Sequence, residues 1–272
     1  MQEDKKKMIR LKADSIREKC KTGRYGIIDL FRDCERLGYK LLRYPIGETG
    51  NLGFTLKRDD DIIIFTNTSS RLSREIFTLA HEIGHAVLHL KDMSSFIDTA
   101  ATISGREVDE TEQEANFFAA CLLMPSFEVD KFLDLEIGEF KKNGLSAIDI
   151  ARLMSEFNVS FDMALNRLEN LGKIDAKQHL LLDNEKNEKR VGNLLRAVGG
   201  NAKLNEISNE VNLPYEFIDY VIYNYNHKAV PQETLEKVLA CYNLTMDDVA
   251  DRLTAPMEED DDLDALIGGL DD

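Results

Sequence analysis

The sequence predicts an α+β fold, in which a small and mostly antiparallel sheet packs among helices and a small all-helical unit follows. Three observations lead to this prediction. Between residues 39 and 67 the apolar residues follow strand-like patterns, and on both sides of this region they recur at helical spacing. After residue 190 only helical patterns remain. The chain of 272 residues is long enough for one large domain or two small ones.

The first half of the chain is expected to alternate between helices and strands. Residues 4–22 have the pattern of a charged helix, and residues 26–38 have that of a second helix, which ends on glycine. Three strands follow, separated by turns rich in glycine or aspartate, at 39–46, 51–57 and 61–67. A long helical pattern then runs from Arg71 to about Leu90.

The second half is expected to be helical. Residues 107–124 form a predicted helix that stops at Pro125, and three more helices are predicted at 126–142, 145–157 and 160–171. The last two flank "FNVS", so they have the rhythm of a helix-turn-helix. An ordinary helical hairpin explains the same pattern.

These elements define the expected domain organisation. A first domain covers 1–172, including the helix-turn-helix-like end, and a second, all-helical domain covers 191–255. The charged stretch 173–190, which contains "DNEKNEKR", is expected to be a linker. After Pro256 the chain has eight acidic residues and no basic one, so we expect 256–272 to be a disordered acidic tail.

Composition and charge exclude some classes of protein. The chain has 50 acidic and 34 basic residues, and its net charge of −16 argues against a general binder of nucleic acid or anionic membranes, because both are polyanions. The four cysteines are too scattered for a disulfide framework: Cys20, Cys34, Cys121 and Cys241. No apolar run is long enough to span a membrane, and the first residues lack an apolar signal core. We therefore expect a reduced, cytoplasmic setting without a membrane partner.

The predicted helix after the strands contains "HEIGHAVLHL", which starts at His81. His81 and His85 are about one helical turn apart, so both imidazoles leave the same face and can bind one zinc ion. Glu82 lies about a quarter turn away, where it is poorly placed as a ligand but well placed as a general base. Gly84 would let a partner helix approach closely. Two histidines on an ordinary helix are the alternative, but three of the five histidines of the chain fall here, which favours a metal site.

A catalytic zinc ion usually has three protein ligands and one open position. The helix at 107–124 offers four carboxylates: Asp109, Glu110, Glu112 and Glu114. Glu112 shares its helical face with two alanines and Asn116, a small and polar face suited to packing beside a metal-binding helix, and Asn116 is expected to orient a ligand. Glu114 shares its face with two phenylalanines, so Glu112 is favoured and Glu114 is the alternative. His89 continues the histidine series and is expected to support the site rather than to close it as a fourth ligand.

The two motifs "FTLAHEIGHAVLH" and "ExxANFFAACLLMP" together resemble the ImmA/IrrE family of zinc metallopeptidases, over about residues 10–172. This resemblance implies a zincin-like fold, with one Zn2+ per chain bound by His81, His85 and Glu112. It implies that Glu82 is catalytic and that Asn116 matches the family's asparagine. It also implies a protein substrate, an XRE-type helix-turn-helix repressor, whose cleavage relieves repression in a mobile element or a stress response.

Residues from about 190 to 254 more loosely resemble an XRE-type helix-turn-helix domain, best at "VPQETLEKVLACYNLTMDDV". The expected recognition helix, about 214–225, carries Glu216 and Asp219 and no Lys or Arg. DNA binding usually requires several cationic contacts to phosphates, so DNA binding is not favoured for this domain. We expect instead a protein-interaction role, either dimerisation or docking of a repressor built on the same fold.

The sequence thus predicts a cytoplasmic, zinc-dependent endopeptidase that cleaves an XRE-type repressor. An extended substrate is expected to add to an exposed sheet edge, at 51–57 or 61–67. Two other functions remain as alternatives. One is a non-catalytic regulator that binds DNA or a repressor through the C-terminal domain, and the other is a component of a toxin–antitoxin pair.

Overall fold

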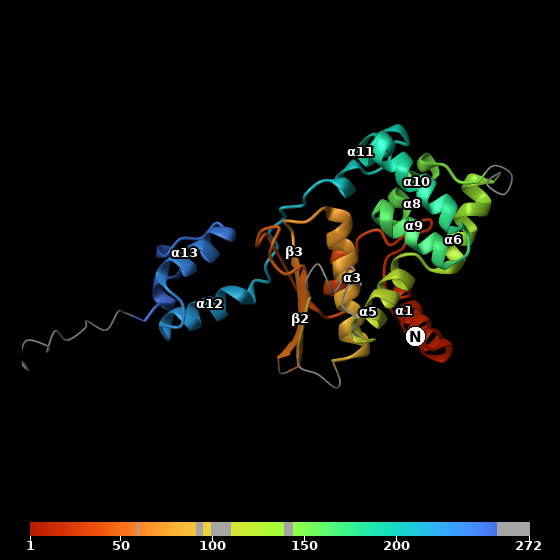
Figure 1. Ribbon diagram of the computed structural model, residues 1–272. Helices are drawn as coiled ribbons and strands as arrows, with labels where there is room; N and C mark the ends of the chain where they lie inside the picture. Colours follow the sequence, from red (N-terminus) through yellow and green to blue (C-terminus); the bar gives the residue numbers. More distant parts are fainter. Residues whose placement is uncertain (59, 91–94, 99–109, 139–143, 255–272) are drawn as a thin grey trace, which may run out of the picture. The chain divides into compact units, whose positions relative to one another are not determined.

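The computed structural model describes residues 1–58, 60–90, 95–98, 110–138 and 144–254. The chain divides into two units, Met1–Pro214 and Tyr215–Asp272. The elements of the first unit, in chain order (Figure 1), are α1 (Glu3–Arg17), α2 (Leu30–Arg36), β1 (Lys40–Tyr44), β2 (Gly53–Arg58), β3 (Asp61–Asn67), α3 (Leu72–Leu88), β4 (Ser95–Asp98), α5 (Glu110–Leu123), α6 (Ser126–Phe132), η1 (Leu133–Ile137), α8 (Ala147–Phe157), α9 (Phe161–Asn170), α10 (Ala176–Lys189), α11 (Val191–Ala197) and η2 (Ala202–Asn205). Every helix in the described ranges is too short or too polar to cross a membrane.

The sheet has four strands in the order β1-β3-β2-β4. β3 pairs in parallel with β1 and antiparallel with β2, and β2 pairs antiparallel with β4. The sheet is therefore mostly antiparallel, as predicted. The expectation that a substrate adds at 51–57 or 61–67 is wrong for this sheet, because β2 and β3 both have partner strands on two sides. The edges of the sheet are β1 and β4.

Helix α3 lies against β2 and β3, and α5 packs between α3 and α1 (Figure 1). Gly84 explains the close approach of α3 and α5. A Cβ atom at Gly84 would lie 3.2 Å from Ala115 Cα and 3.1 Å from Phe118 Cδ1, so a larger residue would push the helices apart. Ala115 and Ala119 are fully buried in this contact region. The small residues therefore bring the polar side chains of α5 next to α3.

Two buried guanidinium groups hold the C-terminal end of α5. Arg17 of α1 donates a hydrogen bond to the Leu122 carbonyl oxygen at 2.8 Å, and Arg167 of α9 donates from Nε to the Met124 carbonyl oxygen at 2.8 Å. The last carbonyls of a helix lack partners within the helix and carry the negative end of its dipole, so cations stabilise them. Burial lowers the pKa of both arginines. The end of α5 is thus anchored to α1 and α9.

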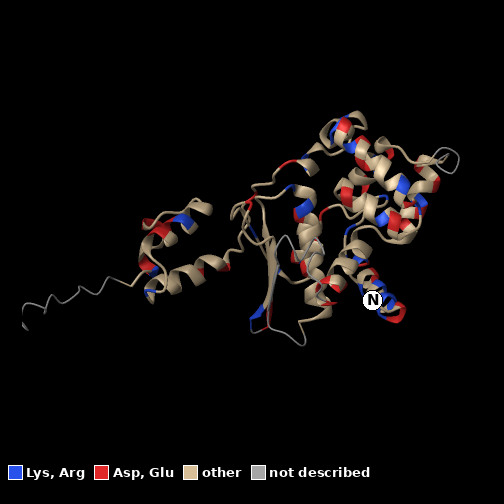
Figure 2. Cartoon of the chain, in the orientation of Figure 1, with Lys and Arg blue, Asp and Glu red and all other residues tan. Residues whose placement is uncertain are grey.

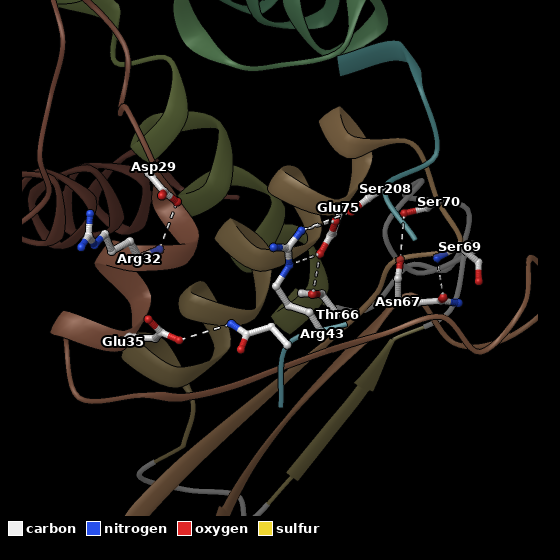
Figure 3. Close-up of polar contacts among 11 residues, drawn as sticks. Asp29, Arg32, Glu35, Arg43, Thr66, Asn67, Ser69, Ser70, Glu75 and Ser208 are labelled. Atoms are coloured by element: carbon white, nitrogen blue, oxygen red, sulfur yellow. Dashed lines mark hydrogen bonds and ion pairs between the residues drawn. The ribbon is translucent and has the colours of Figure 1, made fainter. Parts of the chain in front are cut away.

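A buried ion pair joins the sheet to the first turn of α3 (Figure 3). Arg43 of β1 donates from Nε and Nη2 to the two carboxylate oxygens of Glu75, at 2.7 and 3.0 Å, and the Thr66 hydroxyl donates to Glu75 Oε1 at 3.0 Å. The guanidinium carbon also lies 3.7 Å from the centroid of the Phe31 ring, and Nη2 donates to the Ser208 hydroxyl at 3.2 Å. Glu75 is fully buried, so its charge depends on this pairing, which ties the first turn of α3 to β1 and β3.

The first unit extends further than the sequence predicted. Most of the expected linker, 173–190, is helix α10, and Leu182 of this helix is buried in the main core. The elements that follow add three more buried leucines to the same core: Leu194, Leu195 and Leu204. The segment 206–212 then forms backbone hydrogen bonds with β1 and with the residues before α3. The boundary between the units lies after Pro214, because these few leucines pack against the core despite the charged residues around them.

The second unit has a small core of its own. Its described elements are α12 (Glu216–Asn226), α13 (Gln232–Cys241) and η3 (Asp247–Arg252). One cluster contains its buried apolar residues: Ile218, Val221, Ile222, Leu235, Leu239 and Val249. The expected recognition helix, 214–225, corresponds to α12. The stretch 191–255 is not one compact unit, because α11 and η2 belong to the first unit, and the expected tail at 256–272 lies outside the described residues.

Candidate metal centre

Three side chains from two helices converge inside the first unit. His81 and His85 project from one face of α3, and Glu112 reaches them from the first turn of α5. The two histidine Nε2 atoms lie 2.9 Å apart, and each is 3.2 Å from a carboxylate oxygen of Glu112. Both histidines are fully buried, and Glu112 is 6% exposed. Within the described parts of the chain, these three residues form the one cluster whose donor atoms are placed to hold a metal ion.

The donor atoms fit a divalent metal ion. Ligands on a tetrahedral zinc ion lie about 3.3 Å from one another, which is close to the separations found here. Burial raises the pKa of Glu112, but hydrogen bonds and positive charge from His81 and His85 outweigh burial and hold this pKa well below its ordinary value. A bound cation would provide the same electrostatic stabilisation. Two imidazoles and one carboxylate are therefore suited to share one metal ion at this position.

Asn116 orients the first histidine. It lies one turn after Glu112 on α5, and its Oδ1 atom is 3.0 Å from His81 Nδ1. An amide oxygen accepts hydrogen bonds, so Asn116 Oδ1 accepts one from the Nδ1–H group of His81, and Nε2 is the nitrogen that remains for a metal ion beside Glu112 and His85. A partner of this kind sets both the tautomer and the ring orientation of a metal-binding histidine.

His89 stands at the end of α3 and lies outside the three-residue cluster. Its Nδ1 atom is 3.0 Å from His85 Nδ1, and its Nε2 atom is 3.4 Å from Glu114 Oε2. Glu114 also forms an ion pair with Lys5 of α1. Burial, followed by the nearby His85, lowers the pKa of His89. Glu114, the alternative ligand, thus turns toward His89 and Lys5 and away from the cluster.

Glu82 is fully buried between α3 and β2. The Thr55 hydroxyl of β2 donates a hydrogen bond to Glu82 Oε2 at 2.5 Å. On the same strand, a Cβ atom at Gly53 would lie only 2.5 Å from Glu82 Oε1 and 2.7 Å from Thr78 Cγ2. Only glycine leaves room for the carboxylate at this point. The carboxylate is therefore held from β2, on the same turn of α3 as the two histidines.

The structure brings together His81, His85 and Glu112, and it places Asn116 against His81. Glu82 lies on the same turn of α3 as the two histidines, with its carboxylate against β2. Two β2 residues that enclose the Glu82 carboxylate, Gly53 and Thr55, were not predicted from the sequence. Gly53 carried a signal, because a glycine inside a strand often marks a close approach of two chain segments. Thr55 carried none, because threonine is common in strands for other reasons.

A helix with two buried histidines four residues apart, an intervening glutamate and a carboxylate from a second helix defines a metallopeptidase type of site. Comparison with known proteins agrees with this class. The model of the Peptidase_M78 family, described as the IrrE N-terminal-like domain, matches residues 34–169, which is half of the chain. The chain belongs to this family.

Two curated relatives are similar to parts of the chain. Uncharacterized immunity region protein 2 of Bacillus phage phi105 is 35% identical over 80 residues, which is 29% of this chain and 48% of that protein. The radiation response metalloprotease IrrE of Deinococcus radiodurans is 33% identical over 91 residues, which is 33% of this chain and 26% of that protein. The matches thus span less than half the length of these curated relatives.

Proposed function

We propose that the protein is a zinc-dependent endopeptidase, with His81, His85 and Glu112 as the zinc ligands and Glu82 as the general base. One observation carries the proposal: three buried donors converge, with a buried glutamate on the same helical turn, in a chain of a peptidase family. Two histidines and one carboxylate form a known ligand set of catalytic zinc ions and leave one coordination position open for water or substrate.

Each residue around the proposed zinc site has a separate role in peptide-bond hydrolysis. When bound, a zinc ion supplies a Lewis acid that polarises the scissile carbonyl and acidifies water. Glu82 takes a proton from water as the water oxygen forms a bond to the scissile carbonyl carbon, and it then passes this proton to the amine nitrogen as the C–N bond breaks. The Thr55 hydroxyl orients this carboxylate through Oε2, and Gly53 leaves the space that Oε1 needs. Asn116 keeps the His81 proton on Nδ1.

An XRE-type repressor is the proposed protein substrate, and its cleavage would relieve repression in a mobile element or a stress response. The phage relative supports a repressor context, since it is described as an immunity region protein. An extended substrate segment would add at an edge of the sheet. Of the two edges, β4 is nearer to Glu82, because it pairs with β2, which carries Gly53 and Thr55.

For the second unit, protein interaction is the proposed role in preference to DNA binding. Residues 215–254 contain three basic and seven acidic residues, and two of the basic ones form the ion pairs Lys237–Glu233 and Arg252–Asp219. Helix α12 carries no Lys or Arg (Figure 2). DNA affinity comes largely from cationic contacts to phosphates, and this unit offers few of them. A gel shift that persists in EDTA, together with no proteolysis, would favour the non-catalytic regulator instead.

The decisive experiment mixes the purified protein and zinc with XRE-type repressors from the same genome, starting with any encoded in a neighbouring gene, and intact-mass spectrometry locates the cut. Glu82→Gln should abolish cleavage, because an amide cannot accept the proton, and zinc content should stay near that of the wild type. Glu48→Gln is a matched control at an exposed position and should cleave normally. Cleavage by Glu82→Gln would overturn the role of Glu82, and a wild-type protein that binds no zinc would overturn the zinc site.

A further inference from the structure

The exposed face of α12 is aromatic. Ile218, Val221 and Ile222 turn one side of this helix into the core of the second unit. The opposite side carries Tyr220 and Tyr223, which are 37% and 61% exposed and are not among the side chains that pack against this core. Exposed aromatic residues that gather on one face are typical of protein interfaces. The fold of the second unit thus leaves two large rings available to a partner.

The Tyr223 ring lies against a second ring that is itself held in place. The ring centroids of Tyr223 and His227 are 4.0 Å apart, and the two ring planes form an angle of 29°. His227 Nδ1 lies 2.7 Å from the Tyr223 carbonyl oxygen, and because a carbonyl oxygen only accepts, the imidazole donates this hydrogen bond. Together with Glu216 and Tyr220, these residues follow the spacing i, i+4, i+7 and i+11, which places all four on one helical face. A surface that is ordered in advance loses little side-chain entropy on binding.

The charge around this aromatic face is negative. Glu216 is exposed one turn before Tyr220, and residues 215–254 contain seven acidic and three basic residues. Two of the basic residues, Lys237 and Arg252, already form ion pairs with carboxylates of the same unit. Nucleic acid is a polyanion, and a second copy of the chain would bring the same excess of acidic residues. Charge complementarity therefore favours a cationic protein as the partner.

Aromatic rings beside a carboxylate are suited to a guanidinium group. A cation over the face of a ring is attracted by the ring quadrupole, and the carboxylate accepts hydrogen bonds from the N–H groups. Arginine fits such a surface better than lysine, because its planar group stacks on a ring and is more weakly hydrated. A protein that binds DNA carries arginine on the surface that contacts the phosphates.

We propose that the aromatic face of α12, formed by Tyr220, Tyr223 and His227 together with Glu216, binds an arginine-rich protein surface, namely the DNA-contacting surface of the repressor substrate. This inference rests on the proposed interaction role of the second unit and names the surface of the partner. The zinc site takes no part in it. Operator DNA and α12 compete for the same surface, so the protein docks on repressor molecules that are not bound to DNA.

The first test needs neither zinc nor a substrate. Fluorescence anisotropy gives the Kd of the full-length protein for a short arginine-rich peptide and for the same peptide with lysine in place of each arginine, and the arginine peptide should bind more tightly. Tyr223→Ala should weaken binding of the arginine peptide by about 3- to 30-fold, whereas Tyr223→Phe keeps the ring and should stay within about twofold of wild type. Phe127→Ala is the matched control, because Phe127 is 72% exposed on α6 of the first unit and its loss should not change the Kd. Tyr220→Ala tests the same face if Tyr223→Ala does not fold.

The second test uses a repressor that the wild type cleaves. Tyr223→Ala should raise KM for this repressor and leave kcat unchanged, because docking precedes the chemical step, and operator DNA should slow its cleavage. An unchanged KM would overturn the repressor as the partner.

Other results would overturn the aromatic face as an arginine-binding surface. One is a folded Tyr223→Ala protein that binds the arginine peptide within about twofold of wild type. Tighter binding of a single-stranded oligonucleotide than of the peptide would indicate a nucleic-acid partner, and a wild-type dimer that Tyr223→Ala dissociates would indicate a second copy of the chain. Failure to cleave any repressor would overturn the proposed peptidase function instead, and the peptide measurements would still decide the role of α12.

Discussion

Gly53→Ala probes how tightly β2 encloses the proposed general base. The added Cβ atom would lie 2.5 Å from Glu82 Oε1, whereas ordinary contacts begin at 3.4 Å. The carboxylate must therefore retreat by roughly 1 Å, and a misplacement of that size costs about 100-fold in rate. We expect kcat/KM to fall by about 100-fold, with a stability loss of about 1–3 kcal/mol from overpacking. Zinc affinity should stay near the wild-type value, because the ligands come from α3 and α5.

Three measurements separate a displaced base from a damaged fold: the rate of repressor cleavage, the zinc Kd and the free energy of unfolding in urea. Gly23→Ala is the matched control, since a Cβ atom there would lie 3.6 Å from its nearest neighbours and should change none of the three. A Gly53→Ala protein with wild-type kcat/KM would refute the tight fit of Glu82 against β2. Loss of zinc binding in parallel with activity would show that the whole site moves and not the carboxylate alone.

Thr55→Val keeps the side-chain volume but removes the hydroxyl that donates to Glu82. We expect kcat/KM for repressor cleavage to fall about 10- to 100-fold. An unchanged kcat/KM would contradict the proposal that Thr55 orients Glu82. Glu75→Gln leaves the Arg43 guanidinium without its countercharge and should lower the free energy of unfolding by about 3–5 kcal/mol. The double variant Arg43→Met with Glu75→Leu removes both charges, so its free energy of unfolding should fall by less. Equal losses in the two variants would argue against a charge effect. Because the pKa of Glu112 is lowered in the folded protein, its contribution to the stability of the metal-free protein is complete above the ordinary value of 4.5 and is lost as the pH falls toward the lower folded value. Glu112→Gln should flatten the dependence of Tm on pH in this acidic range, and an unchanged slope would rule out its coupling to the histidines.

The regular elements could be predicted where the apolar pattern is local. The expected strands at 39–46, 51–57 and 61–67 correspond to β1, β2 and β3, and the expected helix after them corresponds to α3. Strand alternation and helical spacing follow from the chain geometry within each element. The order β1-β3-β2-β4 does not follow from such patterns, because pairing depends on contacts between elements. For this reason the expected substrate edges proved to be inner strands.

The C-terminal boundary of the first unit could not be predicted from the sequence for a related reason. Helix α10 is rich in charge, and Leu182 is its buried residue, so the stretch 173–190 has the composition of a linker. A single buried leucine is hard to recognise in the sequence of a charged helix. It is nevertheless enough to pack that helix against an apolar core that other elements have already formed. The same holds for the short α11 and η2, whose leucines join that core.

The sequence by itself determined the pairing of His81 with His85, because residues four apart on a helix share a face in any fold. It also determined that the helix with Glu112 and Asn116 could pack closely beside the two histidines, because Gly84 on one helix and the alanines on the other have small side chains. Only the tertiary structure decided that Glu114 turns to His89 and that β2 encloses Glu82. These partners are 25 or more residues apart along the chain, and they meet only because separate elements pack against each other. No spacing rule links residues on different elements, so such contacts become visible only in the folded protein.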